Sequence, residues 1–512
     1  MTESALEAGN LRAKSARGLV WAAAEKWGVQ LSGLVTLSVL ANLLPVRDFG
    51  LIAMAGVFLA LLNLVSEQGI VSAIIQRREV EDAHLDSAFW ANLAVGVILA
   101  ASAVAASGSV ASFYKEPRLG PIIVCLSARF LVQPFSVVPQ ALLARGLQFR
   151  ETALRSLVSR VLGGVVGIVL AFLGWGVWSL VAQDLTGTLA EALVLWRVTS
   201  WRPHWRFSLA HFSELFAFGI HVTALGITRF AHYQVAPLLL GLLAGPVALG
   251  YYSVGFKMLQ ALLQVMQGIL TTVALPAFAR LQTQLARLRL LFYEASSLIS
   301  LVGFPVYAGI IVAAPELVAV VFGQKWAASI PVLQVLSLSG FVTTMLAPSG
   351  PMLMALNKAS SLLRLSILGA TVSVVLLIAA VPWGIVAVAA AYSGRLFLMA
   401  PLHFHIASRV LGIDWRVYFR GLMPSSVGAV SIVAVGFIAR ALLPDWLGSG
   451  GKLASLVILG ALAYAIVIWA TGPELVKGMR DLVAAALSPG KPELTVDDAA
   501  VAVADFGDRP DS

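Results

Sequence analysis

Five Lys and Arg residues lie deep inside long apolar stretches of this 512-residue chain, where a charge is costly and usually functional. Arg129, Lys257 and Arg395 each lie about ten residues into an expected membrane span, and a rise of about 1.5 Å per residue places them near the middle of the hydrocarbon layer. Arg160 and Arg229 lie in two other spans. A guanidinium presents a fork of donors that matches phosphate oxygens, so this set could hold an anionic, phosphate-bearing molecule in a cationic cavity.

Acids within the spans offer a second interpretation. Arg129 or Arg160 could form structural ion pairs with Glu67, Asp184 or Glu191. Asp184 and Glu191 are seven residues apart and therefore share a helix face, so they could also bind a coupling cation or proton, although pairing with arginine is favoured. The later spans hold Arg229, Lys257 and Arg395 without an acid at comparable depth, which favours the cationic cavity there.

Histidines and cysteines give little sign of catalysis. His221 and His232 are eleven residues apart on one face of an expected helix, where they could line the cavity and titrate. His403 and His405 are two apart on a helix and would diverge, which makes a poor metal pair. The single cysteine, Cys125, excludes an intramolecular disulfide. Because the chain lacks a His-Glu-x-x-His motif, paired cysteines and a phosphate loop, we expect no catalytic residue, metal or cofactor, and no enzyme.

The elements that position these residues are membrane helices. The chain is 59% hydrophobic and only 12% charged, with a mean hydropathy of +0.88. About 20 apolar residues cross the hydrocarbon layer, so we predict an all-α polytopic protein. The fourteen expected spans are 18–44, 49–74, 85–112, 119–142, 153–174, 177–198, 212–242, 247–279, 291–314, 330–356, 362–382, 385–406, 420–443 and 452–472.

The remaining basic residues define the orientation. They concentrate in the N-terminal segment, in every second loop and in the C-terminal tail, which is the positive-inside pattern. Both termini are therefore predicted to be cytoplasmic, with the first span retained as a helix. Lys26 and Arg440 lie near span ends, from which they can reach the polar interface. Inner-loop placement and anionic lipid headgroups account for the net charge of +9, so nucleic-acid binding is not expected.

A faint internal repeat indicates two lobes. Asp48–Val65 and Ala248–Val265 align at an offset of 200, with Gly50 matching Gly250. Two lobes of six helices related by an axis along the membrane normal are a transporter pattern. The predicted organisation is a basic N-terminus (1–17), an N-lobe (18–198), a C-lobe (212–406), two extra helices (420–472) and an amphipathic segment with a disordered acidic tail (473–512).

Local strings identify a resemblance to the polysaccharide-repeat flippases of the multidrug/oligosaccharidyl-lipid/polysaccharide exporter superfamily. It covers residues 15 to 470 and rests mainly on Asp48–Leu51, Asp86–Asn92, Leu142–Arg150, Gly174–Val181, Leu249–Tyr252, Leu275–Gln282 and Phe322–Trp326. The resemblance implies two pseudo-symmetric six-helix lobes around a central cavity. It implies a bacterial inner-membrane protein that flips an undecaprenyl-pyrophosphate-linked oligosaccharide outward by alternating access, serving O-antigen, capsule or exopolysaccharide synthesis. A polysaccharide polymerase and export machinery would be its protein partners.

Two rival functions stay open at this point. A multidrug exporter of the same superfamily would share the lobes but would need an acidic cavity for cationic drugs, which the intramembrane Arg and Lys residues oppose. A membrane-embedded glycan polymerase or ligase would need a sizeable outer loop for its catalytic groups, whereas every expected outer loop is short.

Overall fold

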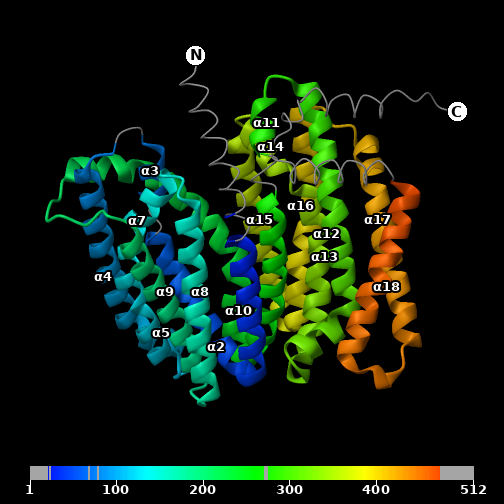
Figure 1. The fold of residues 1–512 in the computed structure, drawn as a ribbon, viewed down its shortest axis with the longest axis horizontal. Helices are drawn as coiled ribbons and strands as arrows, with labels where there is room; N and C mark the ends of the chain where they lie inside the picture. The colour runs from blue at the N-terminus through cyan, green and yellow to red at the C-terminus, as the bar shows by residue number, and fades with distance from the viewer. Residues whose placement is uncertain (1–20, 22–24, 67–69, 78–79, 270–274, 473–512) are drawn as a thin grey trace. The chain divides into compact units, whose positions relative to one another are not determined.

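The described part of the protein is built from helices alone. The computed structural model describes residues 21, 25–66, 70–77, 80–269 and 275–472, and it contains no strand within them. A helix over residues 25–43 precedes a series whose members are α2 Val46–Ser66, α3 Ile70–Gln76, α4 Asp82–Phe113, α5 Leu119–Ser127, α6 Arg129–Val132, α7 Pro134–Arg145, α8 Phe149–Phe172, α9 Val177–Val198, α10 Leu209–Ile269, α11 Leu275–Arg280, α12 Leu285–Val321, α13 Ile330–Leu346, α14 Ser349–Ala355, α15 Ala359–Ala380, α16 Ile385–Leu411, α17 Trp415–Leu442 and α18 Gly448–Thr471 (Figure 1). Short 3₁₀ helices lie at Gln324–Ser329, Val381–Trp383 and Asp445–Leu447.

The protein is a multi-pass membrane protein. Ten helices in the described residues are long and apolar enough to cross a membrane, and the bent pair Leu119–Val132 and Pro134–Arg145 would make eleven. The predicted count of fourteen stays a prediction. It differs from these numbers at three places: span 18–44 lies partly outside the described residues, α9 is too polar to qualify, and the two spans predicted at 212–242 and 247–279 merge into α10.

Two compact units divide the described residues. The first runs to Val254 and includes Leu377–Val388, and the second comprises Gly255–Leu376 with the described residues from Ala389 onward. Within the first unit, α8 and α9 form an antiparallel hairpin, and α4 packs on α5, α6 and α7 (Figure 1). Within the second, α12 packs against α13, α17 and α18. The lobe boundaries expected from the sequence, and the central cavity, stay predictions. The basic N-terminus 1–17 and the tail 473–512 lie outside the described residues.

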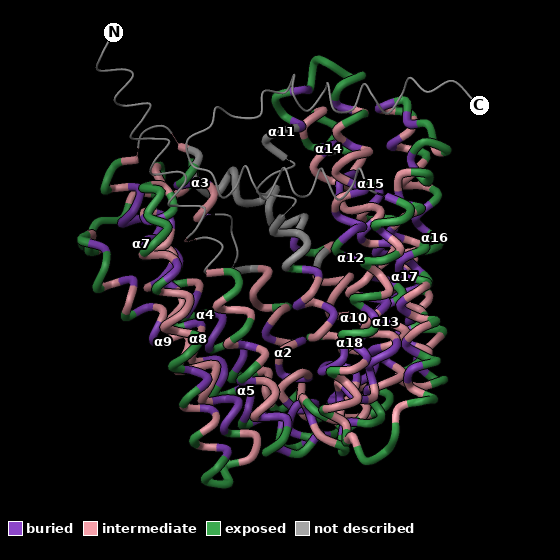
Figure 2. Tube along the Cα trace, turned by 45° about the vertical axis from the view of Figure 1, so that its right-hand side comes forward, coloured by how far each residue is buried: buried purple, intermediate pink, exposed green. Residues whose placement is uncertain are grey.

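Burial alternates along the helices, as expected for a bundle surrounded by lipid. Figure 2 shows exposed, intermediate and buried residues succeeding one another along most of them. Many large apolar side chains, such as Ile98, Val430 and Trp469, are exposed. The interior of the second unit contains an aromatic cluster in which Tyr418 stacks on Phe292 and donates a hydrogen bond to the carbonyl of Met345 at 2.7 Å. Apolar surface faces outward because hydrocarbon lipid tails are themselves apolar.

The span predicted over 119–142 is broken. It forms α5, the single turn α6 and α7, and the chain bends by 44° between α6 and α7. Pro134 is the first residue of α7, and its ring cannot donate a backbone hydrogen bond to the preceding turn. Proline therefore accompanies the bend, which lies four to five residues after Arg129, the first residue of α6.

The sequence repeat corresponds to a reciprocal helix contact inside the first unit. Gly245 adopts a φ of 81°, which interrupts α10, and a second helical stretch begins at Pro246. A Cβ placed on Gly50 of α2 would overlap the carbonyl oxygen of Pro246, and one placed on Gly250 would overlap the carbonyl oxygen of Val46. Val46 thus contacts Gly250, and Gly50 contacts Pro246. At the offset of 200, position 46 corresponds to 246 and position 50 to 250, so each contact joins one position to the equivalent of the other. Only glycine permits this backbone approach.

This crossing leads to a prediction about stability. Gly50→Ala should destabilise the protein by about 1–3 kcal/mol, because the added methyl group meets backbone atoms that cannot rotate away. Gly56→Ala is the matched control on the same helix, since a Cβ there meets no described atom within 4 Å. Thermal unfolding of the purified protein in lipid nanodiscs would measure both variants. Equal midpoints for the two would contradict the close contact.

Candidate functional site

Close packing of α8 on α9 brings the predicted charged residues together. A Cβ on Gly163 would lie 3.3 Å from the Cα of Gly187, and a Cβ on Gly167 would lie 2.9 Å from the Cβ of Gln183. Small residues let two membrane helices approach to backbone contact. The arginines of α8 therefore lie within reach of the acids of α9.

The deeper group of charges centres on Asp184. Its Oδ2 lies 3.5 Å from a terminal guanidinium nitrogen of Arg129, and its charge also acts on Arg160. The Arg160 guanidinium crosses Gly33 on the helix 25–43, where a Cβ would lie 2.6 Å from a guanidinium nitrogen. Asp184 thus contacts Arg129, which is one of the pairings that the sequence left open, and it acts on Arg160 electrostatically without an ion-pair contact among the described residues.

A second group lies two helical turns further along α9. Arg155 forms an ion pair with Glu191 at 3.2 Å and donates to the hydroxyl of Ser156 at 3.1 Å. Ser156 in turn donates to Glu25 at 2.6 Å. This chain of contacts joins α9, α8 and the helix 25–43. The sequence analysis considered Arg129 or Arg160 as partners of Glu191 and did not predict the contact with Arg155.

The two groups differ in charge. Arg129 and Arg160 exceed Asp184 by one positive charge, whereas Glu191 and Glu25 exceed Arg155 by one negative charge. The Asp184 pair is also loosely made: Asp184 Oδ2 and Arg129 Nε are both buried and without a hydrogen-bond partner among the described atoms. Arg155 Nε and Nη1 in the second group also lack a hydrogen-bond partner among the described atoms, so the net positive charge is what favours binding of an anion at the Asp184 group.

The second unit contains two predicted residues of the cationic set. Arg395 of α16 is only 4% exposed, and its guanidinium lies over the ring of Tyr392 at 5.1 Å from the centroid. Such a cation–π contact stabilises the positive charge of a buried guanidinium. Lys257 of α10 is exposed. Both residues belong to the second unit.

Five other ionisable residues named from the sequence have different outcomes. His232 Nδ1 lies 2.7 Å from the carbonyl oxygen of Thr228 in its own helix, to which it can donate. Glu67 and the side chains of His221 and Arg229 lie outside the described residues. Arg440, expected to reach the interface, forms an ion pair with the buried Glu316 at 3.1 Å.

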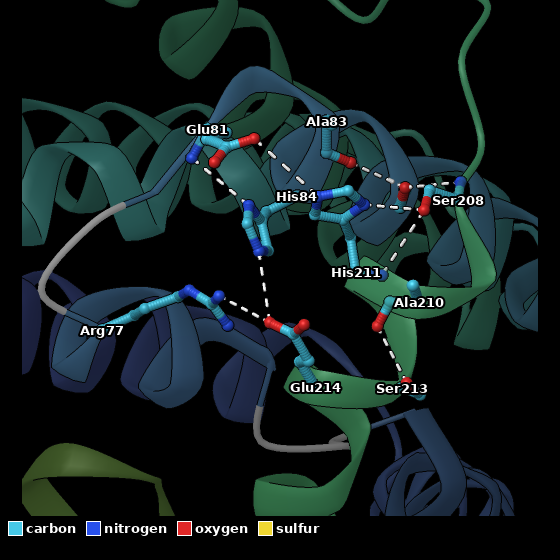
Figure 3. Close-up of polar contacts among 10 residues, drawn as sticks. Arg77, Glu81, Ala83, His84, Ser208, Ala210, His211, Ser213 and Glu214 are labelled. Carbon is cyan, nitrogen blue, oxygen red and sulfur yellow. Dashed lines mark hydrogen bonds and ion pairs between the residues drawn. The ribbon is translucent and has the colours of Figure 1, made fainter.

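A polar cluster that the sequence analysis missed lies at the starts of α4 and α10 (Figure 3). His84 and His211 make an edge-to-face ring contact with centroids 4.4 Å apart. Glu214 lies 2.5 Å from Arg77 and 3.5 Å from His84 Nε2, and the hydrogen bond from Arg77 holds the pKa of Glu214 below its usual range. The available signal was a pair of i, i+3 spacings, Glu81 with His84 and His211 with Glu214.

Comparisons with known proteins agree with this architecture. Residues 39–331 match the family described as polysaccharide biosynthesis protein. The chain is 29% identical to the lipopolysaccharide biosynthesis protein WzxC of Escherichia coli, over 68% of this chain and 71% of that protein. It is 25% identical to the succinoglycan biosynthesis transport protein ExoT of Rhizobium meliloti, over 91% and 95% of the two chains.

Two solved structures share the fold. The lipid II flippase MurJ, in an inward closed conformation, superposes with a TM-score of 0.72 at 10% identity, covering 89% of this chain and all of that one. An inward-facing multidrug resistance transporter of the MATE family superposes with a TM-score of 0.52 at 17% identity, covering 77% and 94%. At these identities the likeness concerns the fold alone.

The contact between Arg129 and Asp184 predicts energetic coupling between α6 and α9. Asp184→Asn should lower stability because Arg129 and Arg160 lose their common counter-charge, and adding Arg129→Gln should recover part of the loss. We expect a coupling energy on the order of 1 kcal/mol in a double-mutant cycle of unfolding in nanodiscs. Thr188→Val is the control, because that hydroxyl bonds only to the Asp184 carbonyl of its own helix, at 2.9 Å. Strictly additive effects would show that the pair is not coupled.

Proposed function

This chain belongs to the family of polysaccharide biosynthesis proteins, and we propose that it flips lipid-linked oligosaccharides across the bacterial inner membrane. The cargo is an undecaprenyl-pyrophosphate-linked repeat unit of a surface polysaccharide, which moves from the cytoplasmic to the periplasmic leaflet. Both termini lie in the cytoplasm. Relatives named for lipopolysaccharide biosynthesis and succinoglycan transport support this cargo class, and the fold shared with a lipid II flippase supports the mode of action.

The observation that carries the proposal is the excess of arginine around Asp184. A pyrophosphate is a dense anion whose oxygens match guanidinium forks. Arg129 and Arg160 bring two such forks to one carboxylate inside the membrane, and that carboxylate balances only one of them. An anionic headgroup can therefore enter this group of charges without removing the resident acid.

Cargo binding is reversible because Asp184 and the pyrophosphate can alternate as partners of the arginines. In the empty protein, Asp184 keeps the arginines from being unpaired in a low-dielectric medium, which would be strongly unfavourable. When the pyrophosphate arrives, it takes the guanidinium donors that Asp184 uses weakly. When it leaves, Asp184 pairs again. A 3.5 Å contact suits this role better than a tight bidentate pair, because the cargo must displace it.

The bend between α6 and α7 offers a hinge for alternating access. Arg129 begins α6, and Pro134 interrupts the hydrogen-bond pattern one turn later. The glycine crossing of α2 with the second half of α10 lies at the predicted periplasmic ends of those helices. We propose that this crossing separates when the protein opens outward. We also propose that Arg229 of the first unit, and Lys257 and Arg395 of the second, take part in binding the anionic cargo.

The rival functions fit less well. A multidrug exporter of cationic compounds needs more acidic than basic side chains within the membrane. The group formed by Arg129, Arg160 and Asp184 instead has a net positive charge. A glycan polymerase or ligase needs room for catalytic groups outside the membrane, but the α8–α9 turn is Leu173–Gly176 and the α15–α16 turn is Val381–Gly384. We therefore propose transport without covalent chemistry, in association with a separate polysaccharide polymerase and export machinery.

Loss of function should follow from removing either arginine of the deeper group. In a strain lacking the gene and any redundant flippase, Arg129→Gln and Arg160→Gln should leave lipid-linked repeat units on the cytoplasmic leaflet, because the headgroup loses a donor fork. Leaflet-specific labelling of the lipid-linked glycan and the yield of surface polysaccharide would measure this. Arg440→Gln is the control, since Arg440 is paired with Glu316 outside this group. Normal polysaccharide in the deletion strain itself would refute the function.

Water and cargo should reach the same positions. We expect cysteines placed at Arg129, Lys257 and Arg395, each in a Cys125→Ala background, to react with a membrane-impermeant thiol reagent, because a cationic transport path must be hydrated. The background change is required because Cys125 is exposed. Added lipid-linked pyrophosphate should slow the reaction at position 129. Absence of labelling at all three positions would contradict the hydrated path, whatever the cargo.

A further inference from the structure

We propose that Glu81, His84 and His211 form a binding site for a divalent transition-metal ion of the Zn²⁺ type, at the junction of α4 and α10 in the first unit. One potential ligand atom from each residue lies within 4.8 Å of the other two. Two imidazole nitrogens and a carboxylate oxygen are a ligand set that Zn²⁺ accepts in tetrahedral sites, with water as the fourth ligand. This site is independent of the proposed transport function.

His211 is held in an orientation suited to metal binding. Its Nδ1 lies 2.6 Å from the hydroxyl of Ser208, and its Nε2 faces Glu81 at 3.8 Å from Oε2 (Figure 3). A metal-binding imidazole usually donates its other ring N–H to an oxygen, which fixes the tautomer and the ring orientation. Ser208 supplies that oxygen, and it leaves Nε2 directed toward the other ligands.

His84 has the matching arrangement. Its side chain is only 3% exposed, and its Nε2 points to Glu214 Oε2 at 3.5 Å, while Glu214 is fixed by Arg77. Its Nδ1 accepts a long hydrogen bond, 3.3 Å, from the backbone N–H of Glu81. To bind a metal ion through Nδ1, the imidazole must turn this atom away from the backbone N–H, with its Nε2–H donated to Glu214. Carboxylate, imidazole and metal would then form the usual second-shell series.

Neighbouring contacts hold the two ligand-bearing segments in register. The backbone N–H of Ser208 donates to Ser87 Oγ at 3.0 Å, and that of His204 donates to the fully buried Asp86 at 3.1 Å. Trp90 Nε1 donates to the His204 carbonyl at 2.8 Å. The start of α10 is therefore fastened to α4 independently of any ion, so little chain entropy opposes completion of the site.

Distances and charge are compatible with an ion. Ligands about 2.1 Å from tetrahedral zinc are about 3.4 Å apart, so the three side chains must close by roughly 1 Å from their present positions. Glu81 is 71% exposed and its carboxylate can rotate, while the partly exposed His211 must supply the movement toward the buried His84. The two carboxylates of Glu81 and Glu214 outnumber the one guanidinium of Arg77. These three side chains therefore have a net charge of −1, which favours a cation.

Metal titration of the complete chain tests the proposal. The protein would carry an affinity tag without histidine, and would be stripped with a chelator in nanodiscs before titration with Zn²⁺ and, separately, Co²⁺. We expect one tight site per chain by calorimetry, the visible absorption of four-coordinate Co²⁺, and a zinc-dependent rise in the thermal midpoint, because a ligand that binds only the folded state stabilises it.

Variants assign the site to these residues. His211→Gln and Glu81→Gln should each weaken zinc binding by about tenfold or more and remove the thermal shift, and Glu214→Gln should weaken it by about tenfold through His84. His204→Gln is the matched control, because His204 is exposed and contacts Asp86 instead. His84→Gln is a poor sole test, since its buried side chain also supports the helix start. Absence of a stoichiometric site in the folded wild type, or His211→Gln binding as tightly as His204→Gln, would overturn the proposal.

Discussion

A guanidinium in a hydrocarbon layer needs a counter-charge or a wet surface within reach, and the first unit is organised around that requirement. Asp184 and Glu191 supply the counter-charges from one face of α9. The glycine contact between α8 and α9 brings the arginines of α8 within reach of them, and Gly33 makes room for Arg160. Without those small residues the helices would separate, and the arginines would face lipid alone.

The same requirement limits how strong the deeper pair can be. A tight, bidentate ion pair between Arg129 and Asp184 would be stable, but it would occupy two of the five guanidinium N–H donors and would be harder for a cargo to displace. The observed contact is longer, and buried atoms of both residues lack hydrogen-bond partners among the described atoms. Buried, half-satisfied polar groups are unusual in structures that only need stability. Their presence at this depth is consistent with a group of charges that exchanges partners.

Two backbone interruptions divide the helices of the first unit. Pro134 bends the chain after Arg129, and Gly245 divides α10 just before the crossing with α2. In a membrane, a broken helix leaves carbonyl groups that must find partners in the protein, so such breaks are retained where they serve packing or movement. The repeat also has a structural counterpart, because Val46 contacts Gly250 and Gly50 contacts Pro246. The residue matches in the sequence did not by themselves indicate this contact.

Hydropathy and the placement of Lys and Arg predicted the helical class and most span positions, and they placed Arg129, Arg160 and Asp184 within spans, because each of these depends only on residue order along the chain. Residue order does not define which faces of which helices meet. Tertiary packing therefore decided that Asp184 contacts Arg129 and acts on Arg160, and that Glu191 pairs with Arg155. It also brought Glu81 and His84 beside His211, which lies more than a hundred residues away, and no local spacing could indicate that contact.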